Sequence, residues 1–282
     1  MFHFAARNLI LFFKDKAAVF LSFLAEFIIV VLYILFIRDN LIEKFAQIND
    51  ADLLTDIWMI AGLLGITSVT TTMGACGIMV DDKAGGIDRD FASSPVSRKS
   101  VVGGYMTAAV IIGLILSWIL FMICRIYILW KYQVDLVCNN LITVYVTLIL
   151  STISNCCIVL LVVSFLKSSN ALASCCTILG ALIGFLTGIY LPMGSMPQSA
   201  QLYVKAFPVS HGVVLFRKEL MQPFIDDSFK GRKLEEIQWF SEYMGVNFTF
   251  EGGYMTWQQS VLVLAAVAAV CFILTIFKLR RR

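Results

Sequence analysis

The chain has 282 residues, of which 59% are hydrophobic and only 15% are charged, and its formal net charge is +3. Soluble domains carry about 25% charged residues, so this composition excludes an ordinary soluble protein and indicates an integral membrane protein. The small positive charge comes mainly from basic residues that flank apolar runs, so we expect no nucleic acid partner.

Six mostly apolar runs are long enough to cross a hydrocarbon core of about 30 Å as helices. They cover residues 19–37, 57–80, 101–124, 141–166, 171–191 and 257–277. The alternation typical of transmembrane strands is absent. In the hydrocarbon core, where no water is present, a helix satisfies its backbone hydrogen bonds internally. We therefore predict an all-α integral membrane protein with a single six-span transmembrane domain over 19–282.

The segment before the first span has its own pattern. Apolar Phe2, Leu9 and Phe13 recur at helical spacing, with polar residues around the other side. This pattern predicts an amphipathic helix over 1–18 that lies in the membrane interface. The alternative is a first span that simply extends further inward.

Basic residues predict the orientation. Because an even number of spans returns the chain to its starting side, both termini share one side of the membrane. That side would hold twelve basic and five acidic residues in its tails and short connections. The positive-inside rule then places both termini in the cytoplasm, and we expect a multi-pass protein of the plasma membrane.

The most charged short stretch, "MVDDKAGGIDRDFASSPVSRK", joins the second and third spans. We expect Asp81 and Asp82 to complement a helix N-terminus. Two glycines permit a sharp turn, Ile87–Ala92 form one further helical turn, and Pro95 ends it. The stretch therefore predicts a short cytoplasmic helix within 81–97, with a merely solvated loop as the alternative.

Glu26 is the ionisable residue near the middle of the first span. An acidic group at that depth costs about 2.5–3.5 kcal/mol, so such residues face a protein interior or a wet cavity. Glu26 is either a cavity-lining or proton-linked carboxylate of a transport pathway, or a polar contact to a Ser or Thr of the second span.

Small residues in the fifth span suggest close packing. Gly180, Gly184 and Gly188 form two overlapping GxxxG units, which favour tight helix contacts in lipid.

Residues 192–255 form the long extracellular region. Pro197 and Pro208 suit first-turn positions of two short helices, which are too short to span and are expected to dip into the outer leaflet. The more polar residues 218–253 predict a solvated cap.

Motifs for catalysis are absent from the sequence. No GxxxxGK[ST] phosphate loop, nucleophile elbow or HExxH motif occurs. Seven of the eight cysteines fall within predicted spans, and there are two histidines. We expect no enzyme activity of its own, and no metal or cofactor bound by this chain.

Four features together carry a family resemblance. They are "RNLILFFKDKAAVF" at 7–20, "DKAGGIDRDFASSPVS" at 82–97, "PMGSMP" with "FPVSH" at 192–211, and a six-span plan with a basic tail. In this combination the chain resembles the membrane subunit of the type-2 ABC exporter family, the permeases of antibiotic, lipid and polysaccharide export systems.

The resemblance implies a connecting helix at the N-terminus, a coupling helix at 81–97 and outer re-entrant helices between spans five and six. It also implies two permease chains, identical or paralogous, each seated on a cytoplasmic ATP-binding subunit, so that two copies of that subunit hold the ATP and Mg²⁺. On the matching positions, the residues that contact the ATP-binding subunit would be Lys83, Ile87, Asp88, Arg89, Asp90 and Phe91.

The leading hypothesis is therefore a permease that moves an amphiphilic compound, such as a drug, an antimicrobial peptide or a lipid, out of the cell. One alternative is a lipid or glycan exporter subunit. The other is a membrane immunity or sensor protein that uses the same six spans without moving a substrate.

Overall fold

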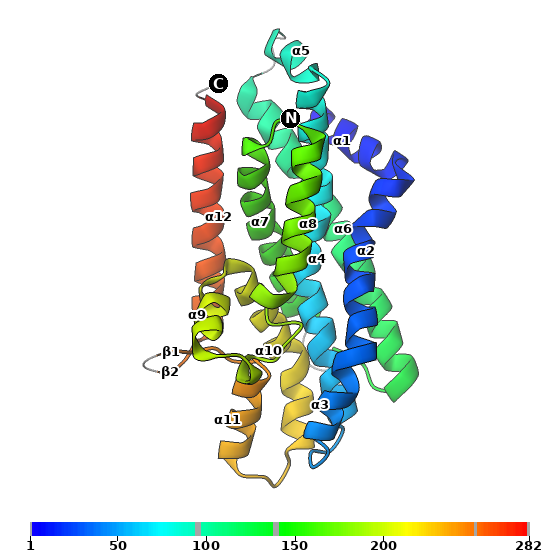
Figure 1. Cartoon of the computed structure of the whole chain (residues 1–282), viewed down its shortest axis with the longest axis vertical. Coiled ribbons are helices and arrows are strands. Elements are labelled where there is room, and N and C mark those ends of the chain that lie inside the picture. Colours follow the sequence, from blue (N-terminus) through cyan, green and yellow to red (C-terminus); the bar gives the residue numbers. More distant parts are fainter. Residues whose placement is uncertain (1, 94–96, 138–140, 251–252, 281–282) are drawn as a thin grey trace.

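The computed structural model describes residues 2–93, 97–137, 141–250 and 253–280. It is a helical bundle with one short two-stranded hairpin (Figure 1). The elements in chain order are α1 (Phe2–Lys14), α2 (Lys16–Leu32), η1 (Tyr33–Ile37), α3 (Arg38–Lys44), α4 (Ala51–Ala84), α5 (Ile87–Ser93), α6 (Arg98–Tyr132), α7 (Leu141–Phe165), α8 (Ser169–Leu186), η2 (Met193–Ser195), α9 (Gln198–Ala206), α10 (Pro208–Ser228), α11 (Leu234–Tyr243), β1 (Thr249–Phe250), β2 (Gly253–Tyr254) and α12 (Trp257–Arg280).

Six helices in the described residues are long and apolar enough to cross a membrane. They are Lys16–Lys44, Ala51–Ala84, Ser100–Tyr132, Leu141–Phe165, Ser169–Leu186 and Trp257–Lys278. The predicted all-α membrane protein with six spans is confirmed. Both ends of the described chain and α5 lie at one end of the bundle, here called the terminal end, and α9, α11 and the hairpin lie toward the other, the far end (Figure 1).

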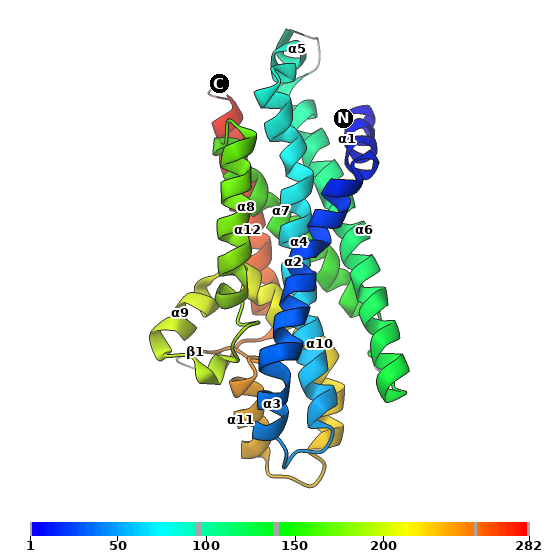
Figure 2. The same cartoon turned by 45° about the vertical axis from the view of Figure 1, so that its right-hand side comes forward.

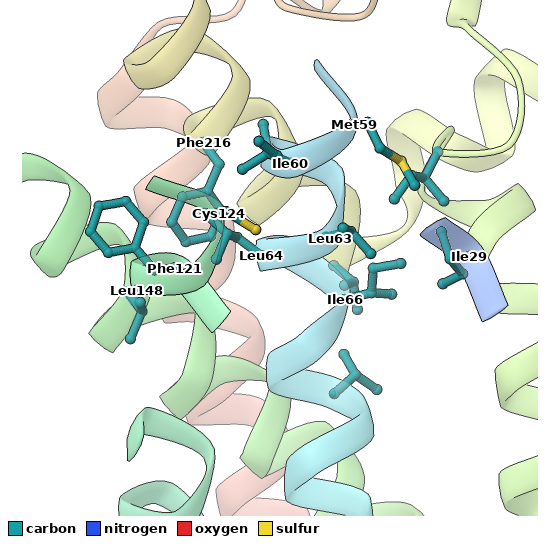
Figure 3. Packing of buried hydrophobic residues seen from close by; sticks show 14 of the residues in the cluster. Ile29, Met59, Ile60, Leu63, Leu64, Ile66, Phe121, Cys124, Leu148 and Phe216 are labelled. Atoms are coloured by element: carbon teal, nitrogen blue, oxygen red, sulfur yellow. The ribbon is translucent and has the colours of Figure 1, made fainter. Parts of the chain in front are cut away.

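The second span, α4, forms the centre of the bundle. In its most apolar stretch 94% of the residues are buried, and it packs against α2, α6, α7 and α10. Figure 3 shows side chains from these neighbours around it, among them Ile29, Phe121 and Phe216. Hydroxyl groups such as that of Thr71 donate to carbonyls of the same helix, so α4 buries polar residues without leaving these donors unpaired.

The turn between α4 and α5 differs in one respect from the expectation. Gly86 adopts a φ of +76°, a conformation that suits glycine, and α5 follows at Ile87 as predicted. However, Asp81 and Asp82 lie in the last turn of α4 instead of at a helix N-terminus. The expectation was wrong because α4 continues to Ala84 before it turns. Pro95, the predicted end of the short helix, lies outside the described residues.

The fifth span, α8, ends earlier than expected. It stops at Leu186, and Gly188 follows with a φ of +66°. The left-handed conformation is one that glycine adopts readily just beyond a helix end. Gly188 therefore belongs to the turn that ends the span and is not part of a helical packing face, which corrects the prediction.

The far end is built around α10. Pro208 occupies the first turn of α10, as predicted, whereas Pro197 precedes α9 as its N-cap residue. We expected a short helix followed by a solvated cap from residue 218, but α10 continues to Ser228. Leu220, Met221 and Ile225 in this continuation are buried, so its apolar side packs against the bundle instead of lying in solvent.

Candidate functional site

The short helix α5 projects beyond the spans at the terminal end (Figure 2). The side chains of Ile87, Asp88, Arg89 and Asp90 are exposed. Lys83, in the last turn of α4, is half-buried. One apolar and three charged side chains thus form a compact, solvent-facing surface that extends from the bundle.

Phe91 faces a different direction from these four residues. Its ring packs edge-on against Phe4 of α1, with ring centroids 4.9 Å apart. The guanidinium of Arg7 lies 5.6 Å from the centres of both rings, a distance at which a cation is attracted to an aromatic face. Phe91 therefore links α5 to α1.

A buried carboxylate adjoins this aromatic contact. Arg7 donates from both terminal nitrogens to Asp82, with each bond 2.8 Å long. The Tyr105 hydroxyl of α6 donates to the same carboxylate at 2.5 Å, and the Tyr105 ring packs edge-on against Phe4. The hydrogen bond to Asp82 raises the pKa of the Arg7 guanidinium, so Arg7 stays protonated.

These contacts form one unit, here called the α5 junction and defined by Phe4, Arg7, Asp82, Phe91 and Tyr105. It joins α5 to α1, the end of α4 and the start of α6. A bidentate Arg–carboxylate pair is geometrically specific, and the side chain of Asp82 is only 5% exposed. Side-chain contacts therefore tie α5 to α1, and through Arg7 and Phe4 to α4 and α6, in addition to the connecting chain.

Four residues of the junction, all but Phe91, were not singled out as functional from the sequence. Phe4 and Tyr105 carry no motif, and Asp82 is separated from Arg7 by 75 positions. The nearest signal is the charge of Arg7 on the polar side of an amphipathic segment. Pairing it with one of several acidic residues required the packing of α1 beside α4 and α6.

Glu26 lies on the side of α2 that faces α4. Its carboxylate accepts a hydrogen bond from the Thr70 hydroxyl at 2.5 Å, and the side chain is buried. Within the described part of the chain, the second carboxylate oxygen has no hydrogen-bond partner. This geometry corresponds to the polar contact to the second span that the sequence left open as one of two interpretations.

The glycines of α8 occupy different environments. A Cβ atom at Gly180 would have no neighbour within 4 Å, whereas one at Gly184 would lie 2.2 Å from the ring of Tyr190. Gly184 therefore serves packing within the chain, and Gly180 faces outward. In its most apolar stretch only 11% of α8 is buried, so most of this span is uncovered.

The described part of the chain holds no group of three or more His, Cys, Asp or Glu side chains that could bind a metal ion.

The family described as ABC-2 type transporter matches residues 1–221, a range that includes α1, the α5 junction and most of α10. No curated protein matches the chain.

Proposed function

Because the chain belongs to the ABC-2 type transporter family, we propose that it is the permease of an exporter that moves an amphiphilic compound out of the cell. The energy comes from a separate ATP-binding subunit, since this sequence contains no GxxxxGK[ST] phosphate loop. ATP and Mg²⁺ are held by that subunit.

The exposed surface of α5 is the observation that carries this proposal. Ile87 offers an apolar contact, 38% exposed, beside the charged Asp88, Arg89 and Asp90. An apolar anchor with charged neighbours suits docking onto another protein, because buried apolar area supplies affinity and charge supplies orientation. The α5 junction then carries the motion of the ATP-binding subunit into the spans.

The basic residues support the orientation that this function needs. Lys and Arg residues concentrate in the tails and connections at the terminal end, which favours a cytoplasmic location for that end in the plasma membrane. A cytoplasmic α5 would face the compartment that contains ATP. The far end, with α9, α10 and α11, would face outward.

The uncovered span α8 supports a pathway between two permease chains. Its exposed side chains include the polar Ser174 and Thr177 and the apolar Ile178 and Leu182. A surface of this mixed character suits an amphiphilic substrate, and the open space at Gly180 allows close approach of a second chain, identical or paralogous.

The proposal is tested by reversing charge on α5. In a complex purified with its co-expressed ATP-binding subunits, the double variant Asp88→Arg and Arg89→Asp should lower permease-dependent stimulation of ATP hydrolysis at least about tenfold, equivalent to about 1.4 kcal/mol. The permease itself should stay folded, because both side chains are exposed.

The matched control reverses an exposed pair at the far end, Asp227→Lys and Lys230→Asp. It should leave stimulation unchanged. Undiminished stimulation in the α5 variant would contradict the docking role of α5. A screen of amphiphilic compounds for stimulated ATP hydrolysis then identifies the substrate class, and failure of every drug, peptide and lipid tested would contradict the export proposal.

A further inference from the structure

A third buried carboxylate lies near the far end, where Asp56 of α4 is 3% exposed. It accepts from Tyr33 at 2.6 Å and from Arg38 at 3.0 Å. Three donors at the end of α6 complete the set, Tyr127 at 3.0 Å, Lys131 at 2.9 Å and Tyr132 at 2.7 Å. Asp56 with these five donors is here called the Asp56 hub.

The hub binds the first span to the second and third. A carboxylate has about four lone-pair sites, and Asp56 faces five donors, two of them cationic. Each donor comes from a helix other than α4. Its acceptor capacity is therefore fully used in holding η1, the start of α3 and the end of α6 against α4.

The helix turn next to the hub is irregular. Tyr33–Ile37 forms a π turn, in which the backbone N–H of Arg38 donates to the carbonyl of Tyr33, five residues earlier. In a regular α-helix each residue advances by about 100°, so residues five apart lie about 140° apart around the axis. The wider π turn places residue i+5 one turn above residue i.

This geometry explains why the π turn occurs at this place. Tyr33 and Arg38 both reach the Oδ1 atom of Asp56, and a regular helix would direct one of them away from it. π turns are rare and are interpreted as local departures from the preferred pitch. The hub contacts therefore hold the first span in a π turn, which is less favourable than a regular α-helix. Without these contacts nothing favours the π turn over the α-helix.

The opposite side of the turn is uncovered. Ile34, Leu35 and Phe36 are 55%, 66% and 65% exposed. If the π turn converts to a regular α-helix, one residue is added to the helical repeat. The face at Ile34–Phe36 then rotates by about 100° relative to the part of the span on one side of the turn. The same residues would then present a different surface to whatever lies beside the first span.

We propose that the Asp56 hub is a releasable latch, which holds the first span in its π form and sets the direction of the exposed face at Ile34–Phe36. Asp56 acts as a positioning residue for that face, and release of the hub lets the turn return to α-helical pitch. That this change is used in each transport cycle rests on the proposed function. The existence of a π form and an α-helical form of the turn is independent of that function.

Two variants shift the latch in opposite directions. Asp56→Asn keeps the side-chain shape but removes the charge that holds Arg38 and Lys131, so it should favour the released form. Deletion of Ile34 places Tyr33 and Arg38 four residues apart, where a regular α-helix lets both reach Asp56. The deletion keeps the hub without the π turn and should favour the latched form.

The experiment measures distances between spin labels at Phe36→Cys and Trp130→Cys in a cysteine-free background, in the complex with its ATP-binding subunits. Rotation of a helix surface by about 100° moves a label by about 8 Å. Without nucleotide, we expect the distance between the two labels in Asp56→Asn to differ by about 8 Å from that in the unaltered chain, because the turn is released. The Ile34 deletion should show no change on trapping with ATP and vanadate, and its substrate-stimulated ATP hydrolysis should fall at least about tenfold.

The control is Asp39→Asn, which alters an exposed carboxylate near Arg38 that lies outside the hub and should behave like the unaltered chain. An unchanged distance between the two labels in Asp56→Asn would overturn the latch, regardless of the rate of ATP hydrolysis. Normal stimulation in the Ile34 deletion overturns its use in transport. A complex in which no variant responds to ATP contradicts the proposed function, while the nucleotide-free distances still test the latch.

Discussion

At the scale of single residues, two buried carboxylates fasten the spans at opposite ends of the bundle. Asp82 is held by Arg7 and Tyr105, and Asp56 is held by two cations and three tyrosines. A buried charge is costly unless it is paired and hydrogen-bonded. Each cluster is therefore sensitive to the loss of any one partner, and this sensitivity makes both of them testable.

Arg7→Ala should destabilise the folded chain by about 2 kcal/mol, because it removes the cation from a buried carboxylate. The side chain of Arg7 is 32% exposed, which keeps the loss at the lower end of the range for buried pairs. The measurement is a double-mutant cycle by denaturant unfolding in mixed micelles. With Asp82→Asn added, the double variant should lose less than the sum of the single losses, and simple additivity would contradict the pair.

Glu26→Gln should leave transport within about twofold of the unaltered chain, or less than about 0.5 kcal/mol. The amide oxygen of glutamine can still accept from the Thr70 hydroxyl, which is the contact that Glu26 makes. The readout is substrate-stimulated ATP hydrolysis across a range of pH. A loss of tenfold or more, or an altered pH profile, would instead support the role of Glu26 as a pathway or proton-linked carboxylate.

At the scale of elements, α8 has two sides with different roles. One side packs against its own chain, where the ring of Tyr190 occupies the space left by Gly184. The other side is exposed and includes Gly180. A GxxxG spacing alone predicts one continuous contact face, but the turn at Gly188 ends the helix before a third glycine could join it.

Alanine at the two glycines of α8 should separate these roles. Gly184→Ala should cost about 1–3 kcal/mol of stability, since the added methyl group overlaps the Tyr190 ring. Gly180→Ala should be neutral or stabilising by up to about 1 kcal/mol through helix propensity. Thermal unfolding of the two variants measures the difference, and equal losses would contradict the assignment.

A bulkier side chain at Gly180 tests the second permease chain. Gly180→Leu should leave the stability of one chain unchanged while reducing the fraction of cross-linked pairs in the membrane. Full pairing in this variant would show that α8 does not form the contact between chains.

At the scale of the whole molecule, α10 connects spans that are distant in sequence. It packs against α4, α7 and α12, and Glu219 accepts from Thr147 at 2.6 Å and from Trp257 at 3.1 Å. The buried guanidinium of Arg217 donates to the carbonyl of Gly188 at 2.7 Å, just beyond the end of α8. Helix C-termini carry partial negative charge, which favours a cation there.

Glu219→Gln should raise stability at neutral pH. Burial raises the pKa of Glu219 in the folded chain above its ordinary value of 4.5, so the folded state binds more protons than the unfolded state in that interval. Stability of the unaltered chain therefore falls as pH rises from about 4.5 through the raised pKa. Glutamine keeps both hydrogen bonds without the charge.

The measurement is the unfolding midpoint of both chains at several pH values. The advantage of Glu219→Gln should disappear below about pH 4, where both side chains are neutral. An advantage that is independent of pH would show that the charge of Glu219 is not its cause.

Much of the architecture follows from local properties of the chain. The six spans were predicted within a few residues at most ends, because apolar length determines what can cross a membrane. The helix at Ile87 was predicted from its flanking glycines. The extension of α10 beyond residue 218 was missed, because its polar and buried positions alternate and the overall composition resembles a solvated segment.

Taken alone, the sequence determined the all-α membrane class and the number of spans, and it indicated the short charged helix between the second and third spans. Apolar run length and turn residues are properties of adjacent positions, and they need no knowledge of packing. Only the tertiary structure decided that Arg7 pairs with Asp82, that Asp56 gathers five donors, and that Gly184 packs against Tyr190 while Gly180 faces outward. The carboxylate contacts join positions far apart in the chain, and many polar residues on each helix could have formed them equally well before the helices were packed.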